Sequence, residues 1–371
     1  MNICYSCKTT LDAEKQSLEH IIPNSLGGRL KSKKLLCIEC NNKLGEEIDA
    51  ELGRQLNPFM NLFMLDRERG KYKPIKGSTD DGEEFILDGI EIKSQPKIKF
   101  TDNHVSFSGN DEKDVKTYFK GLLKKYPNLN IDEIINVANK GKYYLNKPVT
   151  INMALGGESF FRAIAKIFVN FYLVSGGNQI YINNVISYIK GDIIIDKVWY
   201  NYEVDNENLL VKKDHVYHFI KIVGDTEEKI LYGYIELFGA HKFLILLNNN
   251  YDGEYFSQQY FYDLLRKEII HNDVNLNYSS SEIERILNIK DNKYLISKIQ
   301  YSLQSYFSAS QLQQQDLVIK KIIKECLNEV FSQKTDEKIT KELLSRLIHE
   351  ISTQLAIFLT KNKSNIDKLY F

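Results

Sequence analysis

Residues 4–42 read CYSCKTTLDAEKQSLEHIIPNSLGGRLKSKKLLCIECNN, and the cysteines of this stretch predict how the N-terminus folds. They form two pairs, each with two residues between its members: Cys4 with Cys7, and Cys37 with Cys40. Each pair has the spacing of a zinc knuckle, and two knuckles together provide four thiolate ligands for a closed tetrahedral site. We therefore expect a structural Zn²⁺ held by all four cysteines.

A redox dithiol and a chance spacing are the two alternatives to a zinc site. A redox site has no need of a second pair, and two matched pairs in so short a segment argue against coincidence. Four of the five cysteines lie in the first forty residues, unlike the disulfide framework of a secreted mini-domain. The N-terminus has no apolar signal core, and no stretch reaches the roughly 18 apolar residues of a membrane span. We expect a cytoplasmic protein that does not enter a membrane.

Charge gives no overall preference for a partner. The chain has 371 residues, 43% of them hydrophobic, which is enough for two or three globular units. Its 49 basic and 49 acidic side chains cancel. Residues 1–45 are locally basic, with seven Lys and Arg against four Asp and Glu, and four of the seven form a run: Arg29, Lys31, Lys33 and Lys34. We predict that this basic run contacts phosphates; the alternative is a solvated loop.

Catalytic residue types stand between and after the cysteine pairs. Glu19-His20 precedes Ile-Ile-Pro, and Asn41 follows the second pair directly. Hydrolysis of a phosphodiester needs a base for water and a divalent cation to neutralise developing charge. His20 suits the first task because imidazole titrates near neutrality. Glu19 and Asn41 suit the second because Mg²⁺ and Mn²⁺ prefer oxygen ligands. The alternatives are a structural histidine and an asparagine that caps a helix.

Together these residues resemble the zinc-containing HNH, or ββα-metal, endonucleases, whose motifs are C-x-x-C, E/D-H-I-I-P, a Gly-Gly turn and L-C-x-x-C-N. The resemblance covers about residues 1–55. It implies a β-hairpin bearing His20 as general base, and a helix bearing Asn41, which with Glu19 would bind the catalytic Mg²⁺ or Mn²⁺. The four cysteines would bind zinc and pin the hairpin to the helix. Asn41 stands where the family often has histidine, and residues 32–34 contain no counterpart of its middle asparagine.

The resemblance also implies a substrate and a setting. Members of the family hydrolyse phosphodiester bonds of nucleic acid, and we expect double-stranded DNA here. Many such nucleases act in bacterial restriction or phage defence, so we carry that role over as an expectation. The main alternative is a non-catalytic zinc ribbon that binds nucleic acid or protein; the Glu19-His20 pair argues against it, because a binding module has no need of a base beside a carboxylate.

The remaining residues predict an α+β protein with a mixed middle region and a helical C-terminal region. We divide the chain into an HNH module at 1–58, a small β region or linker at 59–112, a mixed α+β domain at 113–275 and a helical region at 276–371. Apolar residues at helical intervals predict a core helix within 156–177. Runs rich in β-branched and aromatic residues predict antiparallel strands within 215–248. We expect the regions after the module to serve target recognition, homo-oligomerisation or regulation by a partner or small ligand.

Overall fold

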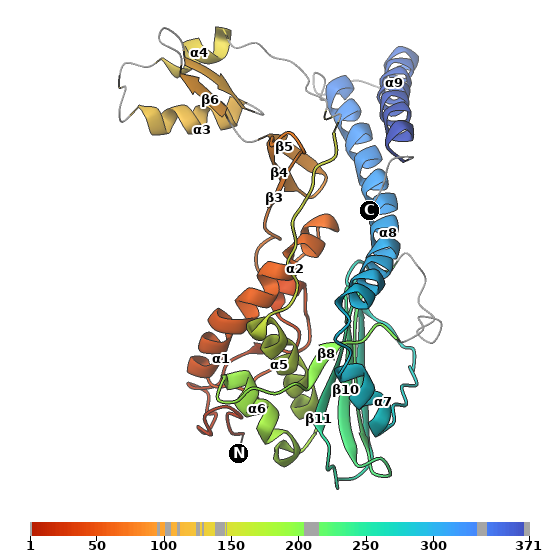
Figure 1. Ribbon diagram of the computed structural model, residues 1–371. Helices are drawn as coiled ribbons and strands as arrows, with labels where there is room; N and C mark the ends of the chain where they lie inside the picture. The colour runs from red at the N-terminus through yellow and green to blue at the C-terminus, as the bar shows by residue number, and fades with distance from the viewer. Residues whose placement is uncertain are drawn as a thin grey trace. The chain divides into compact units, whose positions relative to one another are not determined.

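The computed structural model describes residues 2–94, 97–100, 105–109, 112–123, 127, 130–137, 145, 147–203, 215–331 and 340–366. The chain divides into two compact units, Met1–Tyr306 and Phe307–Phe371. Helices and strands are mixed along the described residues, which confirms the predicted α+β class. The four-part division of the chain remains a prediction. Figure 1 shows the elements of each unit.

The N-terminal region begins with a short antiparallel hairpin of β1 (Glu19–His20) and β2 (Lys31–Ser32), in which His20 lies opposite Lys31. The connection contains a 3₁₀ turn, η1 (Asn24–Leu26), closed by Gly27 in the left-handed conformation with φ 82°. At the next residue, Gly28, a Cβ atom would lie 1.8 Å from the carbonyl oxygen of Ile22. The Gly-Gly pair is therefore required, because one glycine reverses the chain and the other allows two backbone segments to touch.

A continuous helical run begins within the second cysteine pair. It consists of α1 (Ile38–Leu44), a π-helical turn η2 (Gly45–Asp49) and α2 (Ala50–Leu62). Cys37 is the N-cap of α1, and its sulfur accepts a hydrogen bond from the backbone N–H of Cys40. Hairpin and helix confirm the ββα arrangement that the family resemblance implied. The π turn adds a residue to the helix, a distortion that often accompanies functional sites.

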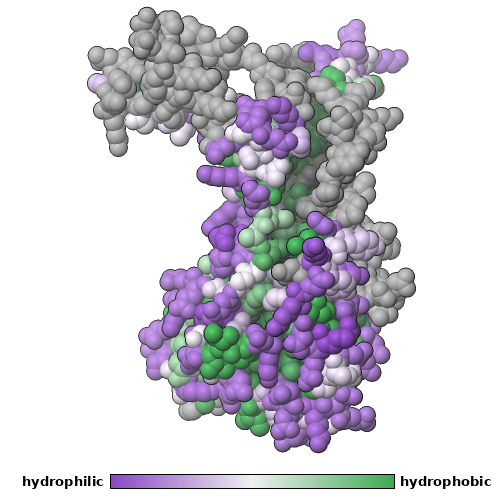
Figure 2. Space-filling view, in the orientation of Figure 1, coloured by the Kyte–Doolittle hydropathy of each residue, from purple (hydrophilic) through white to green (hydrophobic). Residues whose placement is uncertain are grey.

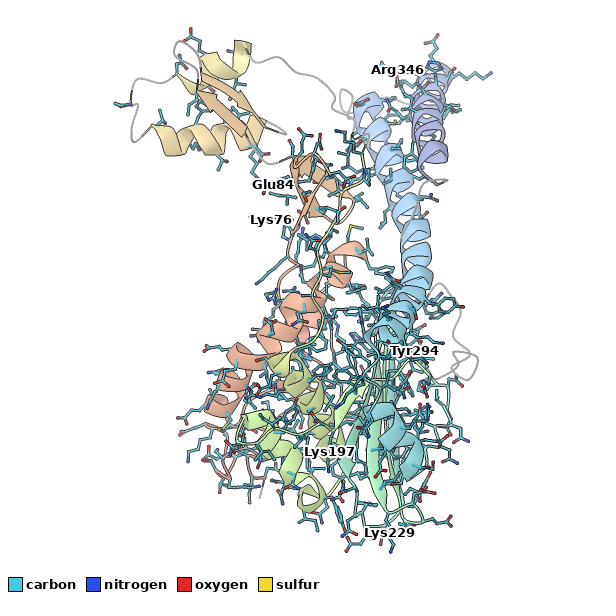
Figure 3. The ribbon with its side chains drawn as sticks, in the orientation of Figure 1. Lys76, Glu84, Lys197, Lys229, Tyr294 and Arg346 are labelled. Carbon is cyan, nitrogen blue, oxygen red and sulfur yellow. The ribbon has the colours of Figure 1, made fainter. Side chains whose placement is uncertain are left out.

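Short strands and helices come next. A three-stranded antiparallel sheet consists of β3 (Ile75–Ser78), β4 (Glu84–Asp88) and β5 (Glu91–Ser94). Exposed side chains on it include Lys76 and Glu84, which Figure 3 labels. A second hairpin pairs β6 (Lys97–Phe100) with β7 (Val105–Ser108), and the helices α3 (Glu112–Leu122) and α4 (Ile131–Val137) follow.

The largest sheet has six antiparallel strands in the order β13-β12-β9-β10-β11-β8. The predicted core helix is α5 (Glu158–Val174), and α6 (Asn183–Lys190) follows it after the short turn η3 (Gln179–Ile182). The predicted strands are also confirmed, as β9 (Tyr217–Asp225), β10 (Ile230–Leu237) and β11 (His241–Asn248). The others are β8 (Val198–Tyr200), β12 (Phe256–Asp263) and β13 (Glu268–Ile269).

Both faces of this sheet are covered. On one face, side chains such as Ile222 and Phe243 belong to one hydrophobic core with Phe168 of α5 and with Ile22 and Leu52 of the N-terminal region. On the other face, strand residues pack with the helix α7 (Ser280–Leu287) in a second cluster. The N-terminal region therefore shares its core with α5 and the sheet, which brings residues far apart in sequence to its surface.

The C-terminal part is helical, as predicted. It contains α8 (Asn292–Phe331), which runs across the unit boundary, and α9 (Lys341–Ile366). Within the second unit, Cys326 and Val330 of α8 pack with Leu347 of α9. Among the described residues, no helix combines the length and apolar character needed to span a bilayer. Hydrophilic side chains cover most of the described surface on the face that Figure 2 shows.

Candidate nuclease and zinc sites

The four cysteines of the knuckles meet in one place. Their Sγ atoms all lie within 4.8 Å of one another, and those of Cys7 and Cys37 are 3.7 Å apart. Tetrahedral Zn–S bonds of about 2.3 Å require sulfur atoms about 3.8 Å apart. The quartet thus has the composition and spacing of a structural zinc site, as the sequence predicts.

Backbone hydrogen bonds shape the first knuckle. The N–H of Cys4 donates to the carbonyl oxygen of Thr9 (2.8 Å), and that of Lys8 donates to the carbonyl oxygen of Cys4 (2.9 Å). The N–H of Tyr5 reaches the carbonyl oxygen of Leu35, just before the second pair (3.0 Å). The last of these bonds joins the two knuckles, and the other two close the turn of the first.

A cavity of about 280 Å³ lies beside the hairpin and α1. It contains all three predicted catalytic residues in its wall, which consists of Leu18, Glu19, His20, Pro23, Asn24, Ser25, Asn41, Gly45, Asp49 and Ala50. Asn41, Gly45 and Asp49 recur at intervals of four residues, so they lie on one face of the helical run. The cavity therefore joins the hairpin that carries the histidine to the helix that carries the asparagine.

Glu19 is buried and firmly held. Its side chain is 5% exposed, and its Oε1 accepts hydrogen bonds from Lys166 Nζ (2.6 Å) and Asn170 Nδ2 (2.9 Å), both in α5. Lys166 Nζ also contacts Asp49 Oδ2 at 2.5 Å. Burial raises the pKa of Glu19. Burial acts to lower the pKa of Lys166, but the two carboxylates outweigh it and raise that pKa. The Lys166 ammonium thus lies between two carboxyl groups and pairs with both.

Several oxygens at the cavity remain available for a cation. Asn41 donates through Nδ2 to Ser17 Oγ (2.5 Å), which leaves its Oδ1 as an acceptor. Asp49 Oδ1 and Ser25 Oγ are buried and have no hydrogen-bond partner among the described residues. Buried polar atoms nearly always have a partner, so these two point to water or a cation in the cavity. Carboxylate and amide oxygens are the ligands that Mg²⁺ and Mn²⁺ prefer.

His20 stands at the cavity with one ring nitrogen engaged. Its Nε2 is 2.8 Å from Glu68 Oε2, on the loop after α2. The other oxygen of that carboxylate accepts a hydrogen bond from Lys31 Nζ at 2.5 Å. These hydrogen bonds, from Lys31 first and then from His20, lower the pKa of Glu68 to about 2. Glu68 is therefore ionised at neutral pH.

The comparison with protein families agrees with this geometry. Residues 4–57 match the family model of the HNH endonucleases. The match supports nuclease activity at the level of the family, with nucleic acid as the substrate. Neither a curated protein nor a solved structure matches the chain significantly. We call the matched residues the HNH module.

The basic run of the HNH module divides into two pairs. Arg29 Nη2 donates to the carbonyl oxygen of Asp66 (3.0 Å), and Lys31 pairs with Glu68. Lys33 and Lys34 are exposed, and neither has an ion pair among the described residues. The prediction of phosphate contacts therefore remains open for all four, although Arg29 and Lys31 already have protein partners.

Sequence reasoning missed four residues at the site: Asp49, Glu68, Lys166 and Asn170. The sequence could have indicated Asp49, because it follows Asn41 by two helical turns and so lies on the same face of the helical run. The indication for Lys166 and Asn170 was weaker: they lie four residues apart in a part of α5, residues 163–174, that is otherwise apolar. Buried polar groups need partners, so such a pair implies a contact elsewhere in the fold. No pattern in the sequence around Glu68 indicates that it lies at the site.

Proposed function

We propose that the HNH module is a divalent-metal-dependent endonuclease that hydrolyses phosphodiester bonds of DNA. One observation carries the proposal: Glu19, His20 and Asn41 line a single cavity next to a cysteine quartet with zinc-site spacing. A binding-only zinc ribbon has no use for a carboxylate, an imidazole and an amide around one cavity.

Each residue has a distinct task in this proposal. His20 accepts the proton of the attacking water through Nδ1, the ring nitrogen that has no hydrogen-bond partner among the described residues. Glu19, through the oxygen not bonded to Lys166, and Asn41, through Oδ1, hold Mg²⁺ or Mn²⁺. When bound, the cation neutralises charge on the phosphate and the leaving oxygen. The four cysteines hold Zn²⁺, which keeps the first loop against the start of α1.

We extend this proposal to the DNA contacts and to the biological setting. Lys33 and Lys34 have no ion pair among the described residues and are exposed to phosphates, whereas Arg29 and Lys31 already bind the loop at 66–68. Double-stranded DNA and a role in bacterial restriction or phage defence come from the family resemblance. We also propose that the regions after the HNH module form a homo-oligomer or bind a regulatory partner.

The test is cleavage of supercoiled plasmid by the full chain with Mg²⁺ or Mn²⁺. We expect His20→Ala to reduce the rate by about 10²- to 10⁴-fold, the usual contribution of a general base, and to leave the zinc content unchanged. The matched control is His271→Ala, which removes an exposed histidine of the same unit. Cleavage by His20→Ala at the wild-type rate would refute the assignment. Metal-independent DNA binding without cleavage, unaffected by Glu19→Ala, would favour the zinc-ribbon alternative.

A further inference from the structure

Glu68 contacts the one imidazole that the proposed function uses. Its carboxylate lies between two residues that face each other across the hairpin, His20 on β1 and Lys31 on β2. An ionised carboxylate can only accept hydrogen bonds. The proton of the His20–Glu68 bond must therefore sit on Nε2, which leaves the lone pair on Nδ1.

The loop that carries Glu68 is attached to the HNH module at several points. The backbone N–H of Glu68 donates to Asn24 Oδ1 (2.8 Å), and Asn24 itself lines the catalytic cavity. Arg29 binds the carbonyl oxygen of Asp66, and the Asp66 carboxylate pairs with Lys267 Nζ at 2.6 Å. The HNH module therefore binds this loop through Asn24, in the turn after Pro23, and through Arg29 and Lys31 of the basic run.

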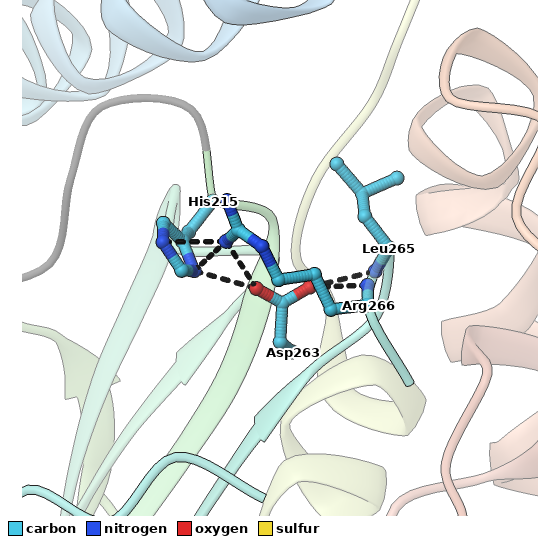
Figure 4. A network of polar contacts seen from close by, with 4 residues as sticks. All are labelled: His215, Asp263, Leu265 and Arg266. Carbon is cyan, nitrogen blue, oxygen red and sulfur yellow. Dashed lines mark hydrogen bonds and ion pairs between the residues drawn. The ribbon is translucent and has the colours of Figure 1, made fainter. Parts of the chain in front are cut away.

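The partner of Asp66 is held in turn by the sheet. Lys267 belongs to the turn after β12, and Figure 4 shows the polar network that fixes this turn. The buried Asp263 accepts the backbone N–H groups of Leu265 and Arg266, both at 2.8 Å, and its other oxygen lies 2.5 Å from His215 Nδ1. An exposed ion pair therefore joins this turn to Asp66, and the HNH module binds the same loop through Asn24, Arg29 and Lys31.

We propose that Glu68 is a positioning residue: its carboxylate fixes the His20 ring in the Nε2–H tautomer and presents Nδ1 as the basic atom. This inference rests on the proposed function, in which His20 is the general base. A carboxylate on the far nitrogen of a catalytic histidine serves the same end in serine hydrolases, where loss of the correct tautomer is costly. Lys31 then has a structural task, since it orients Glu68 and does not bind phosphate.

The first test measures the tautomer and does not depend on cleavage. The full chain is labelled with ¹⁵N-histidine, and two-bond ¹H–¹⁵N spectra are recorded at about pH 8.5, well above the usual pKa of imidazole. The His20 signals are identified by their loss in His20→Gln. We expect the Nε2–H pattern in the wild type and in Glu68→Gln, whose amide oxygen can accept the same bond. In Glu68→Ala we expect a mixture of tautomers.

The matched control is Asp66→Asn, two residues away, which removes the exposed pair with Lys267 and leaves the His20 contact intact. It should keep the wild-type His20 signals. An unchanged tautomer in Glu68→Ala would overturn the proposal, and so would a wild type whose His20 carries the proton on Nδ1. A mixture in Asp66→Asn as well would assign the effect to the loop as a whole, and would also overturn a specific role for Glu68.

The second test is kinetic and uses a DNA duplex with Mn²⁺. Glu68→Ala should lower kcat by about 10- to 100-fold, a part of the general-base contribution, with little change in KM, and Glu68→Gln should recover most of the loss. Faster cleavage by Glu68→Ala would mean that the carboxylate occupies the place of a phosphate, which contradicts a positioning role. If the wild-type chain cuts nothing but Glu68→Ala still alters the tautomer, the proposed function fails and the positioning of His20 stands.

Discussion

Replacement of Lys166 by methionine should destabilise the fold by about 3 kcal/mol, because it leaves two carboxylates without their shared cation. The Lys166 side chain is 2% exposed, and those of Glu19 and Asp49 are 5% and 18% exposed. Removing one partner of a buried ion pair usually costs about 3–5 kcal/mol. Glu19 can escape by taking up a proton, which at pH 7 costs about 3 kcal/mol for a group with an ordinary pKa of 4.5. Because Glu19 can be protonated at this cost, we expect the loss of unfolding free energy to lie near the lower end of the 3–5 kcal/mol range, at about 3 kcal/mol.

Urea unfolding followed by tryptophan fluorescence measures this loss. The chain has a single tryptophan, Trp199, which stacks on Phe161 of α5 and so reports on the helix that carries Lys166. Adding Glu19→Gln to Lys166→Met should recover about half of the lost stability, since the amide keeps a neutral acceptor for Asn170 and removes the buried charge.

Lys221→Met is the matched control for the same substitution. Lys221 is also buried in the first unit, but its counter-charge, Asp273, is almost fully exposed, so no buried carboxylate is left behind. We expect a loss of about 1–2 kcal/mol, the cost of an unpaired buried acceptor at the carbonyl oxygen of Val274. A loss below about 1 kcal/mol for Lys166→Met, or no recovery with Glu19→Gln, would refute the reasoning, given the usual cost of breaking a buried pair.

Two further predictions concern the zinc site and the buried histidine His218. Cys37→Ser should abolish binding of about one zinc per chain and lower the melting temperature, because a structural zinc contributes directly to folding; metal analysis checks this, with Cys326→Ser as the control that keeps its zinc. Burial lowers the pKa of His218 from 6.5 to about 4. The unfolded chain therefore takes up this proton first as pH falls, so about 3 kcal/mol of stability is present above pH 6.5 and is lost between 6.5 and 4. His218→Gln, whose amide can still donate to the carbonyl oxygen of Leu26, should flatten that part of the stability curve; an unchanged slope would contradict it.

The parts of the site that the sequence predicts are those whose geometry depends on local spacing. Two residues between cysteines fix a knuckle, a Gly-Gly pair permits the close turn at Gly28, and the polar-apolar pattern after Cys40 forms a helix. Glu19 and Asn41 reach the same cavity because a hairpin and a helix, both short, are joined through four cysteines. Each of these relations involves fewer than about 40 residues of chain, so sequence patterns capture them.

The parts that the sequence does not reveal depend on contacts between distant segments. The bond between Asn170 and Glu19 joins residues 151 positions apart, and that between Lys166 and Asp49 joins residues 117 apart. Apolar periodicity correctly predicts that α5 is buried, but not against which surface. Contacts from α5 therefore set the environment of Glu19, and they come from residues outside the HNH module.

The same distinction between local and distant contacts applies to the basic run. A count of charges gives four cations near the predicted site, and each phosphate contact of a DNA-binding protein contributes about −0.9 to the slope of log affinity against log salt. Arg29 and Lys31, however, already bind the loop at 66–68 through a carbonyl oxygen and a carboxylate. Both side chains keep unused N–H groups, but these contacts restrict them and Glu68 offsets the charge of Lys31, so half of the run contributes less net attraction. We therefore expect the run to supply about two phosphate contacts, from Lys33 and Lys34, while Arg29 and Lys31 hold the loop that carries Glu68.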